Sequence, residues 1–326
     1  MNDQNGERIP DYADIHLARA RIRSRVRETP VINEPRLDQA LGCRLYCKCE
    51  NLQRAGAFKF RGACNAIARL REDGIEGDVA THSSGNHGAA LALAARLDGR
   101  GAHVVMPENS SPLKLQAVRD YGGHVHFCAP TNAARAAMLE ELVARGMLPI
   151  HPYDHADIIA GQGTAALELV QAVPSLEQVI APVGGGGLVS GAAIACRPRG
   201  ITVFGAEPEG AADTAASLER GAIVDRFEPD TIADGLRAIV GRRNFRVIRE
   251  QVRAVLLVSD DEIRSAMHLF WEMTRLLIEP SSATVIAAIL RHRDLFAGRK
   301  LGAIISGGNI HPADWLALTG SAAAGR

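Results

Sequence analysis

The side chain best suited to covalent chemistry is Lys59, which lies in the run Gly-Ala-Phe-Lys-Phe-Arg-Gly-Ala at 56–63. The aromatic residues Phe58 and Phe60 flank it, and the cation Arg61 follows two positions later. Because desolvation and a nearby like charge both disfavour an ammonium ion, we predict a pKa for Lys59 below that of a solvated lysine. A neutral lysine is a nucleophile and a base, and it can form a Schiff base with an aldehyde cofactor. The alternative is a solvated lysine at a helix start, which is the commoner situation.

Four consecutive glycines at 184–187 could hold the phosphate group of such a cofactor. They lie between an expected strand and an expected helix, so backbone N–H groups and the positive end of the helix dipole can converge on an anion. The motif Gly-x-Gly-x-x-Gly would need a glycine where Val189 or Ser190 stands, and the P-loop Gly-Lys-Ser/Thr is absent. The spacing therefore favours a smaller phosphorylated cofactor over a nucleotide, and the alternative is a flexible loop.

Two further polar segments lie where expected strands end. Ser-Ser-Gly-Asn-His at 83–87 precedes a helix, where hydroxyls and backbone N–H groups suit a substrate carboxylate. Ser-Gly-Gly-Asn at 306–309 follows a strand, at the end where open parallel sheets place ligands. Taken alone, the first could be a serine helix cap and the second an ordinary turn. Asp234 and Glu279 precede a glycine and a proline, and we interpret both as loop residues.

The alternation of strands and helices predicts how these segments are positioned. The first series of expected strands is 78–83, 102–107, 124–129 and 148–151, and the second is 178–183, 202–206, 254–258 and 301–305. Helical patterns separate the strands, which is typical of parallel sheets with crossover helices. We therefore expect an α/β protein of two parallel-sheet, three-layer domains with the site in the cleft between them. The expected small, substrate-closing domain is 79–151, and the expected large, cofactor-binding domain is 1–78 and 152–326.

The bulk composition excludes several classes of protein. The 326 residues include 37 Lys and Arg against 37 Asp and Glu, so a net charge of zero argues against a nucleic-acid partner. No apolar run approaches the ~18 residues of a membrane helix, and we expect no membrane association. The charged first thirty residues do not resemble a signal peptide, so we expect a cytoplasmic protein. The six cysteines lack zinc-ribbon spacing and are predicted to be buried thiols.

Together the four motifs match a known family in their order and their intervals. The chain resembles the fold type II pyridoxal-phosphate enzymes, specifically the serine/threonine dehydratase and serine racemase group, from residue 12 to residue 310. This group includes 3-hydroxyaspartate and phenylserine dehydratases. The resemblance implies a tryptophan synthase β-like fold, a homodimer, a small-molecule amino-acid substrate, and pyridoxal 5'-phosphate held between the domains.

The resemblance also implies roles for individual residues. Lys59 would form the Schiff base with the cofactor, and Phe58 would pack beside it. Asn86 would bond the ring hydroxyl, and Ser306 the ring nitrogen. The cofactor phosphate would be held by Gly184, Gly185, Gly186 and Gly187. The substrate would be contacted by Ser83, Ser84, Asn86, His87, Arg135 and Ala238.

A divalent cation is implied by the segment Gly-Ala-Glu-Pro-Glu-Gly-Ala-Ala-Asp at 205–213, which resembles the cation segment of serine racemase-like members. Through this resemblance, Glu207, Asp213 and the carbonyl of Ala211 would be its ligands. Two carboxylates and a carbonyl suit Mg²⁺ or Ca²⁺. The alternative is a solvated acidic loop.

The resemblance implies a lyase of amino-acid catabolism that removes water from L-3-hydroxy amino acids and releases a 2-oxo acid and ammonia. Lys59 would take the Cα proton. Ser306 is a neutral partner for the ring nitrogen, so the ring is a weak electron sink and prompt loss of a β-hydroxyl is favoured. Ser84 keeps serine racemase activity open, because a second base on the opposite face of Cα permits racemisation.

Two residues give opposite indications about the substrate. Ala238 stands where serine racemase-like members carry a serine, and the freed volume favours a substrate bulkier than L-serine, such as L-threonine or L-threo-3-phenylserine. Arg135 matches an arginine that some relatives turn toward a second carboxylate, which favours 3-hydroxyaspartate; its alternative is a solvated helix arginine. The remaining classes are a catalytically silent sensor and an NAD-dependent oxidoreductase, and the glycine spacing disfavours the latter.

Overall fold

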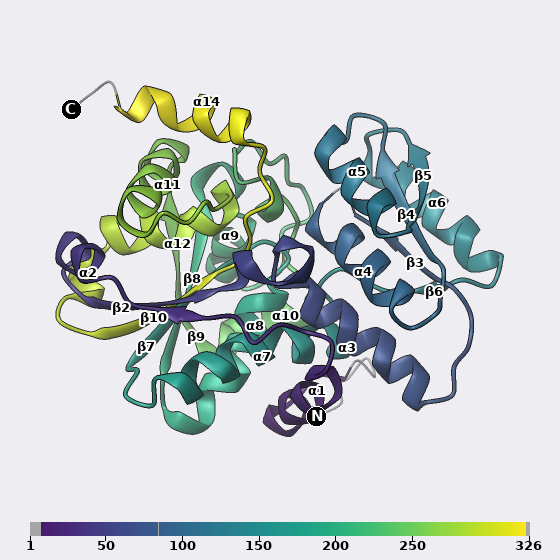
Figure 1. Cartoon of the computed structure of the whole chain (residues 1–326), viewed down its shortest axis with the longest axis horizontal. Helices are drawn as coiled ribbons and strands as arrows, with labels where there is room; N and C mark the ends of the chain where they lie inside the picture. Colours follow the sequence, from purple (N-terminus) through teal and green to yellow (C-terminus); the bar gives the residue numbers. More distant parts are fainter. Residues whose placement is uncertain (1–7, 84, 324–326) are drawn as a thin grey trace.

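Two sheets organise the chain, as Figure 1 shows. The computed structural model describes residues 8–83 and 85–323. The larger sheet has six strands in the order β1-β2-β10-β7-β8-β9, and the smaller has four in the order β5-β4-β3-β6. All neighbouring strands pair in parallel except β1, which is antiparallel to β2. The expected α/β fold of two parallel-sheet domains is therefore confirmed.

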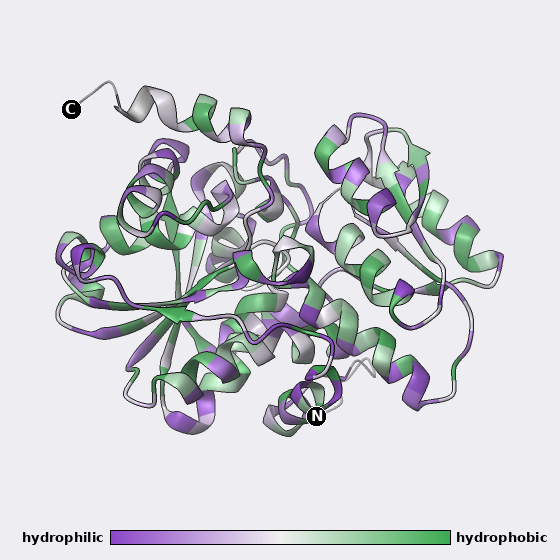
Figure 2. Cartoon of the chain, in the orientation of Figure 1, coloured by the Kyte–Doolittle hydropathy of each residue, from purple (hydrophilic) through white to green (hydrophobic). Residues whose placement is uncertain are grey.

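The large sheet is buried between two layers of helices. Its strands are β1 (Val31–Ile32), β2 (Arg44–Cys49), β7 (Gln178–Pro182), β8 (Thr202–Pro208), β9 (Val252–Val258) and β10 (Lys300–Ile305). One face packs on α1 (Tyr12–Ile22), α7 (Ala156–Ala172), α8 (Gly187–Cys196) and α10 (Arg242–Gln251). The other packs on α2 (Pro35–Leu41), α11 (Asp260–Thr274), α12 (Pro280–Arg291) and α14 (Pro312–Ala323). Burial on both faces explains the apolar runs of β7, β9 and β10, which are largely green in Figure 2.

The small sheet repeats this layering on a smaller scale. Its strands are β3 (Val79–His82), β4 (Ala102–Pro107), β5 (His124–Cys128) and β6 (Leu148–Pro149). One face packs on α3 (Lys59–Glu72), α4 (Asn86–Arg96) and α5 (Pro112–Asp120), and α6 (Asn132–Ala144) covers the other. The whole sheet comes from residues 79–149, and the expected domain division at 79–151 stays a proposal.

Short elements complete the described chain. They are α9 (Asp213–Arg220), α13 (Arg293–Phe296), and the 3-10 turns η1 (Glu50–Leu52), η2 (Arg54–Gly56), η3 (Arg197–Arg199), η4 (Glu209–Ala211) and η5 (Asp234–Leu236). All six cysteines are buried free thiols, as predicted. Among the described residues, no helix combines the length and the apolar character needed to cross a membrane.

Candidate active site

Lys59 is the first residue of α3 and lies where the two sheets meet. Its amine donates a 2.9 Å hydrogen bond to the carbonyl of Pro152, in the segment by which the chain leaves the small sheet. The amine also lies 5.2 Å from the ring centre of Phe58 and 5.9 Å from that of Tyr153. The backbone N–H of Phe58 donates to the carbonyl of Ser306. The start of α3 is thereby attached to the loop that follows β10.

Burial lowers the pKa of Lys59 from 10.5 to about 8, as the flanking aromatic residues predicted. A sizeable fraction of the amine is therefore neutral near pH 8. The predicted contribution of Arg61 to this shift is wrong, because desolvation alone accounts for it. Arg61 is fully buried, and its guanidinium is paired with Glu50 and Glu168. Residues two positions apart do not face each other on a helix, so Arg61 points away from the amine.

Each glycine of the 184–187 loop lies so close to neighbouring atoms that a side chain would not fit without displacing them. A Cβ at Gly185 would lie 2.3 Å from the ring of Tyr153, and one at Gly187 would lie 2.6 Å from Oε1 of Gln162. Gly186 has a φ of +87°, which a side chain rarely adopts. Asn244 donates a 2.6 Å hydrogen bond to the carbonyl of Gly185. The loop is buried and held, so the alternative of a flexible loop does not apply.

The surroundings of this loop fit a phosphorylated ligand. Both amide atoms of Gln162 are buried without a hydrogen-bond partner among the described residues, and the side chain lies against Gly187 and Gly62. A buried unpaired amide is costly unless a ligand satisfies it. The loop also opens α8, whose first turn has no side-chain cap from the described residues, so its N–H groups could bond an anion. These residues could hold the phosphate of pyridoxal 5'-phosphate.

A chain of hydrogen-bonded side chains at Asn86 joins the small-sheet part of the chain to the large-sheet part. This residue opens α4 and donates a 2.8 Å hydrogen bond to Oε1 of Glu279, while Asn309 donates a 2.9 Å bond to Oδ1 of Asn86. Burial raises the pKa of Glu279 to about 7, against opposing contributions from Lys114 and Asn86. Glu279 lies in the loop before α12, as interpreted from the sequence, but it is only 3% exposed and so is not a solvated loop carboxylate. The apolar helix that it precedes is the sequence signal for this burial.

Asp234 takes part in a second contact between the two parts of the chain. Its carboxylate pairs with the amine of Lys114, which lies on α5. Burial lowers the pKa of Lys114, and the charge of Glu279 opposes this shift. Asp234 is therefore a bridging residue rather than simply a residue of a loop.

Ser306 lies at the carboxyl end of β10 with an exposure of 3%. Its hydroxyl is 3.0 Å from that of Ser282, on α12. Ser282 in turn donates to the carbonyl of Gly307 and accepts from its N–H, both at 2.6 Å. Sequence reasoning missed Ser282, which orients Ser306. The pair presents a neutral hydroxyl, as the predicted partner of a ring nitrogen requires.

The 83–87 segment supplies polar groups at the start of α4. Ser83 accepts a 3.2 Å hydrogen bond from the N–H of Gly85. His87 is 2% exposed, and neither of its ring nitrogens has a well-formed hydrogen bond among the described residues. Burial, followed by the charge of Lys59, holds the pKa of His87 well below its usual range. His87 is thus a neutral imidazole near Lys59. The predicted catalytic residue Ser84 lies outside the described residues.

Two histidines that the sequence reasoning missed extend this site toward α6. The rings of His82 and His151 meet edge to face at 5.9 Å, and His151 meets Tyr153 in the same way at 4.6 Å. Burial and then His82 lower the pKa of His151 to about 4. Nδ1 of His151 accepts a 2.9 Å hydrogen bond from the N–H of Asp154. His82 ends β3 and His151 lies two residues after β6, and this position near strand ends is the signal that could have found them.

Arg135 lies near His82. Its charge contributes, after burial, to the lowered pKa of His82. The Nε atom of Arg135 is buried with no hydrogen-bond partner among the described residues, so a fully solvated helix arginine does not fit. Ala238 is half-buried and follows η5, and the backbone of Gly235 and Leu236 in η5 abuts Gly184. Their roles toward a substrate stay predictions.

The predicted cation ligands form a buried acidic pair. Glu207 accepts 3.0 Å hydrogen bonds from the N–H groups of Thr214 and Ala215, and Oδ2 of Asp213 accepts one of 2.8 Å from Val240. Burial raises the pKa of Glu207 to about 8 and that of Asp213 to about 7. Oδ1 of Asp213 has no partner among the described residues. Glu207, Asp213 and Ala211 are all buried, so the alternative of a solvated loop is wrong.

This donor set suits Mg²⁺ or Ca²⁺, which prefer carboxylate and carbonyl oxygens. The described residues contain no group of three or more His, Cys, Asp or Glu side chains able to hold a metal. The candidate cation site therefore rests on two carboxylates and the backbone carbonyl of Ala211.

Fold and site together define a class: a pyridoxal-phosphate enzyme of fold type II, with a buried lysine amine and a glycine loop suited to a phosphate. Residues 22–307 match the family described as "Pyridoxal-phosphate dependent enzyme". The chain belongs to this family, and within it to the serine/threonine dehydratase and racemase group. Its cofactor is pyridoxal 5'-phosphate, as predicted.

Named relatives resemble the chain over nearly its whole length. The serine racemase of Dictyostelium discoideum is 46% identical, over 91% of this chain and 94% of that protein. The L-threo-3-hydroxyaspartate ammonia-lyase of Saccharomyces cerevisiae is 42% identical, over 93% and 94%. The solved structure of maize serine racemase superposes with a TM-score of 0.92 at 38% identity, covering 97% of this chain and 99% of that one.

Proposed function

We propose that the protein is an ammonia-lyase that removes water from L-3-hydroxy amino acids, with L-threo-3-hydroxyaspartate as its preferred substrate. The products would be a 2-oxo acid and ammonia. The observation that carries the choice of substrate is the buried, unpaired Nε of Arg135 beside His82. The yeast relative, named for the same substrate, supports it.

The described residues support an elimination. When bound, the cofactor supplies an aldehyde for amine capture and a ring that accepts electron density. Lys59, with its lowered pKa, can remain neutral and take a proton from Cα. Ser306 offers the ring nitrogen a hydroxyl rather than a carboxylate, so it does not hold that nitrogen protonated. Ser83, Asn86 and His87 would bind the α-carboxylate.

A second carboxylate on the substrate would bind at the side of the site that Arg135, His82 and His151 form. An arginine with an unsatisfied donor gains most from a charged acceptor, and a carboxylate can accept from it directly. The hydroxyl and methyl groups of L-serine and L-threonine, or the ring of L-threo-3-phenylserine, would leave Arg135 unpaired. The half-buried Ala238 still favours L-threonine and L-threo-3-phenylserine, so both substrates are included in the same test.

A substrate panel with a matched pair of variants tests this proposal. L-threo-3-hydroxyaspartate, L-threonine, L-threo-3-phenylserine, L-serine and D-serine would be supplied, and 2-oxo acid, ammonia and the opposite enantiomer measured. We expect the highest kcat/KM for hydroxyaspartate, and a loss of about 10-fold or more for it alone in Arg135→Met. Arg145→Met, which changes an exposed arginine directly after the same helix, is the control. No oxo acid from any substrate would refute the lyase.

Racemisation is the second candidate, because Ser84 is present and the Dictyostelium relative is a named serine racemase. In the panel, D-serine formed from L-serine faster than pyruvate would favour it. Replacing Ser84 by alanine should then abolish racemisation and spare elimination. Retention of racemisation in that variant would remove Ser84 from the mechanism.

We further propose a homodimer located in the cytoplasm, and a division into a small domain at 79–151 and a large domain formed by the rest. The resemblance to the family supports the dimer. The small sheet supports the division, because residues 79–149 alone supply its strands. Light scattering of the purified protein would test the dimer, and a monomeric mass would contradict it.

A further inference from the structure

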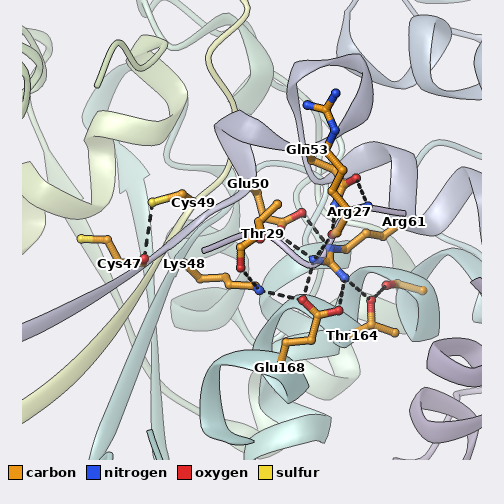
Figure 3. A network of polar contacts seen from close by, with 11 residues as sticks. Arg27, Thr29, Cys47, Lys48, Cys49, Glu50, Gln53, Arg61, Thr164 and Glu168 are labelled. Atoms are coloured by element: carbon orange, nitrogen blue, oxygen red, sulfur yellow. Dashed lines mark hydrogen bonds and ion pairs between the residues drawn. The ribbon is translucent and has the colours of Figure 1, made fainter. Parts of the chain in front are cut away.

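A cluster of four buried charges lies beneath the first turn of α3, as Figure 3 shows. It consists of Lys48, Glu50, Arg61 and Glu168, which we call the buried quartet. Arg61 bonds both oxygens of Glu50 at 2.7 and 2.8 Å, and both oxygens of Glu168 at the same two distances. Lys48 pairs with Glu168 at 2.6 Å. None of the four is more than 7% exposed.

The quartet joins four segments that surround Lys59. Lys48 lies on β2, Glu50 in η1, Arg61 on α3 and Glu168 on α7. Thr29 closes one end, because its carbonyl accepts from Lys48 at 2.6 Å and its hydroxyl donates to Glu50 at 2.5 Å. Two cations face two anions, so the charge sums to zero. The position of the start of α3 is thereby fixed against both β2 and α7.

Stability alone does not account for this arrangement. Apolar side chains of similar volume are often as stabilising as a buried ion network, because desolvation of the charges offsets their attraction. Burial raises the pKa of Glu168, but the hydrogen bonds and charges of Arg61 and Lys48 outweigh it and lower that pKa. Glu168 and Arg61 are therefore held in their charged forms beneath the reactive amine, where a packing role would not need charge.

Lys59 projects from the opposite side of the same helical turn. The groups that face its amine are the rings of Phe58 and Tyr153 and the neutral histidines His87 and His151. Its proton affinity is lowered by desolvation, with no contribution from the quartet. A neutral quartet explains why a fully buried arginine two residues away leaves the amine unaffected.

We infer that the buried quartet is a positioning device for Lys59: it holds the start of α3 and keeps the charge beneath the amine at zero. The inference rests on the proposed role of Lys59 as the cofactor-binding amine. It makes a signed prediction for each member. Removal of one anion leaves a net positive charge and should release the Lys59 proton more readily, whereas removal of one cation should have the opposite effect.

Three variants test the inference: Glu168→Gln, Lys48→Met, and the double variant that carries both changes. The chain has four lysines, Lys48, Lys59, Lys114 and Lys300, so biosynthetic ¹³Cε-lysine labelling gives few NMR signals in the full-length, cofactor-free protein, and Lys59→Ala assigns that of Lys59. Across a helix about 10 Å wide, one uncompensated charge should move the Lys59 titration midpoint by about 0.5 to 1 pH unit. We expect a downward shift for Glu168→Gln, an upward shift for Lys48→Met, and the wild-type midpoint for the double variant.

The control is Asp73→Asn, which changes the charge of the exposed Arg69–Asp73 pair at the other end of α3 and should leave the midpoint in place. Shifts in the holoenzyme kcat/KM pH profile should carry the same signs. Equal or absent shifts in folded variants would overturn the inference and leave only a structural role. If Glu168→Gln does not fold, the other two variants still test the inference. Lys48→Met must raise the Lys59 titration midpoint, and the double variant must return it to the wild-type value. The NMR titration does not depend on catalysis, so a failure of the proposed function can be distinguished from a failure of this inference.

Discussion

The side chain of Asn86 donates a 2.8 Å hydrogen bond to Oε1 of Glu279, and this bond joins the start of α4 to the residue that precedes α12. Oε2 of Glu279 is buried without a partner among the described residues. A carboxyl group in this setting is stabilised in its protonated form. The contact between the two parts of the chain is therefore sensitive to pH.

Glu279→Gln should flatten the pH dependence of stability between pH 4.5 and 7. The raised pKa of about 7 means that the folded chain holds a proton that the unfolded chain, with a pKa near 4.5, has lost. The resulting stability is complete below pH 4.5 and is lost as the pH rises through 7. Urea unfolding across this range should give a slope smaller by about 1.4 kcal/mol per pH unit in the variant. Glu219→Gln, at an exposed position, should keep the wild-type slope.

Lys59→Ala should remove the visible absorption of the bound cofactor. The amine at the start of α3 has no substitute nearby, because Lys114 is engaged with Asp234. Absorption spectra of the purified variant and of Lys300→Ala, a lysine at the start of β10, make the comparison. An unchanged spectrum in Lys59→Ala would show that another lysine carries the cofactor.

Gly185→Ala should weaken cofactor binding while leaving the fold intact. The added Cβ would lie 2.3 Å from the ring of Tyr153, so either the loop or the ring must move. Overpacking of this kind typically costs about 1–3 kcal/mol, or about 5- to 150-fold in affinity. Gly320→Ala, where a Cβ has open space, is the control. Equal cofactor affinity in both variants, measured by fluorescence titration, would argue against a phosphate site at this loop.

Removal of divalent cations should lower the melting temperature. Glu207 and Asp213 are buried with raised pKa values, and a bound cation would neutralise their repulsion. We expect EDTA to lower the melting temperature of the wild type, added Mg²⁺ or Ca²⁺ to restore it, and Asp213→Asn to respond to neither. If neither EDTA nor added cation changes the melting temperature of the wild type, Glu207 and Asp213 do not bind a divalent cation.

Residues that are close in sequence were predictable, and residues joined across the fold were not. Lys59, its flanking aromatic residues and the 184–187 loop form local patterns, so sequence reasoning found them and the parallel sheets. Glu279, Ser282, Gln162 and the two site histidines become polar neighbours of the site through contacts between segments distant in sequence. Arg61 was misread for the same reason, because the carboxylates that neutralise it come from η1 and α7.

The place of β10 within the large sheet has a consequence for how the protein is made. β10 lies between β2 and β7, so a strand near residue 300 must insert between two strands that leave the ribosome much earlier. Until then, the apolar edges of β2 and β7 have no partner, and Ser306 is missing from the site. Contacts of such long sequence separation form slowly. We therefore expect cofactor capture through Ser306 only after β10 has been synthesised, and until then the unpaired edges of β2 and β7 are open to aggregation.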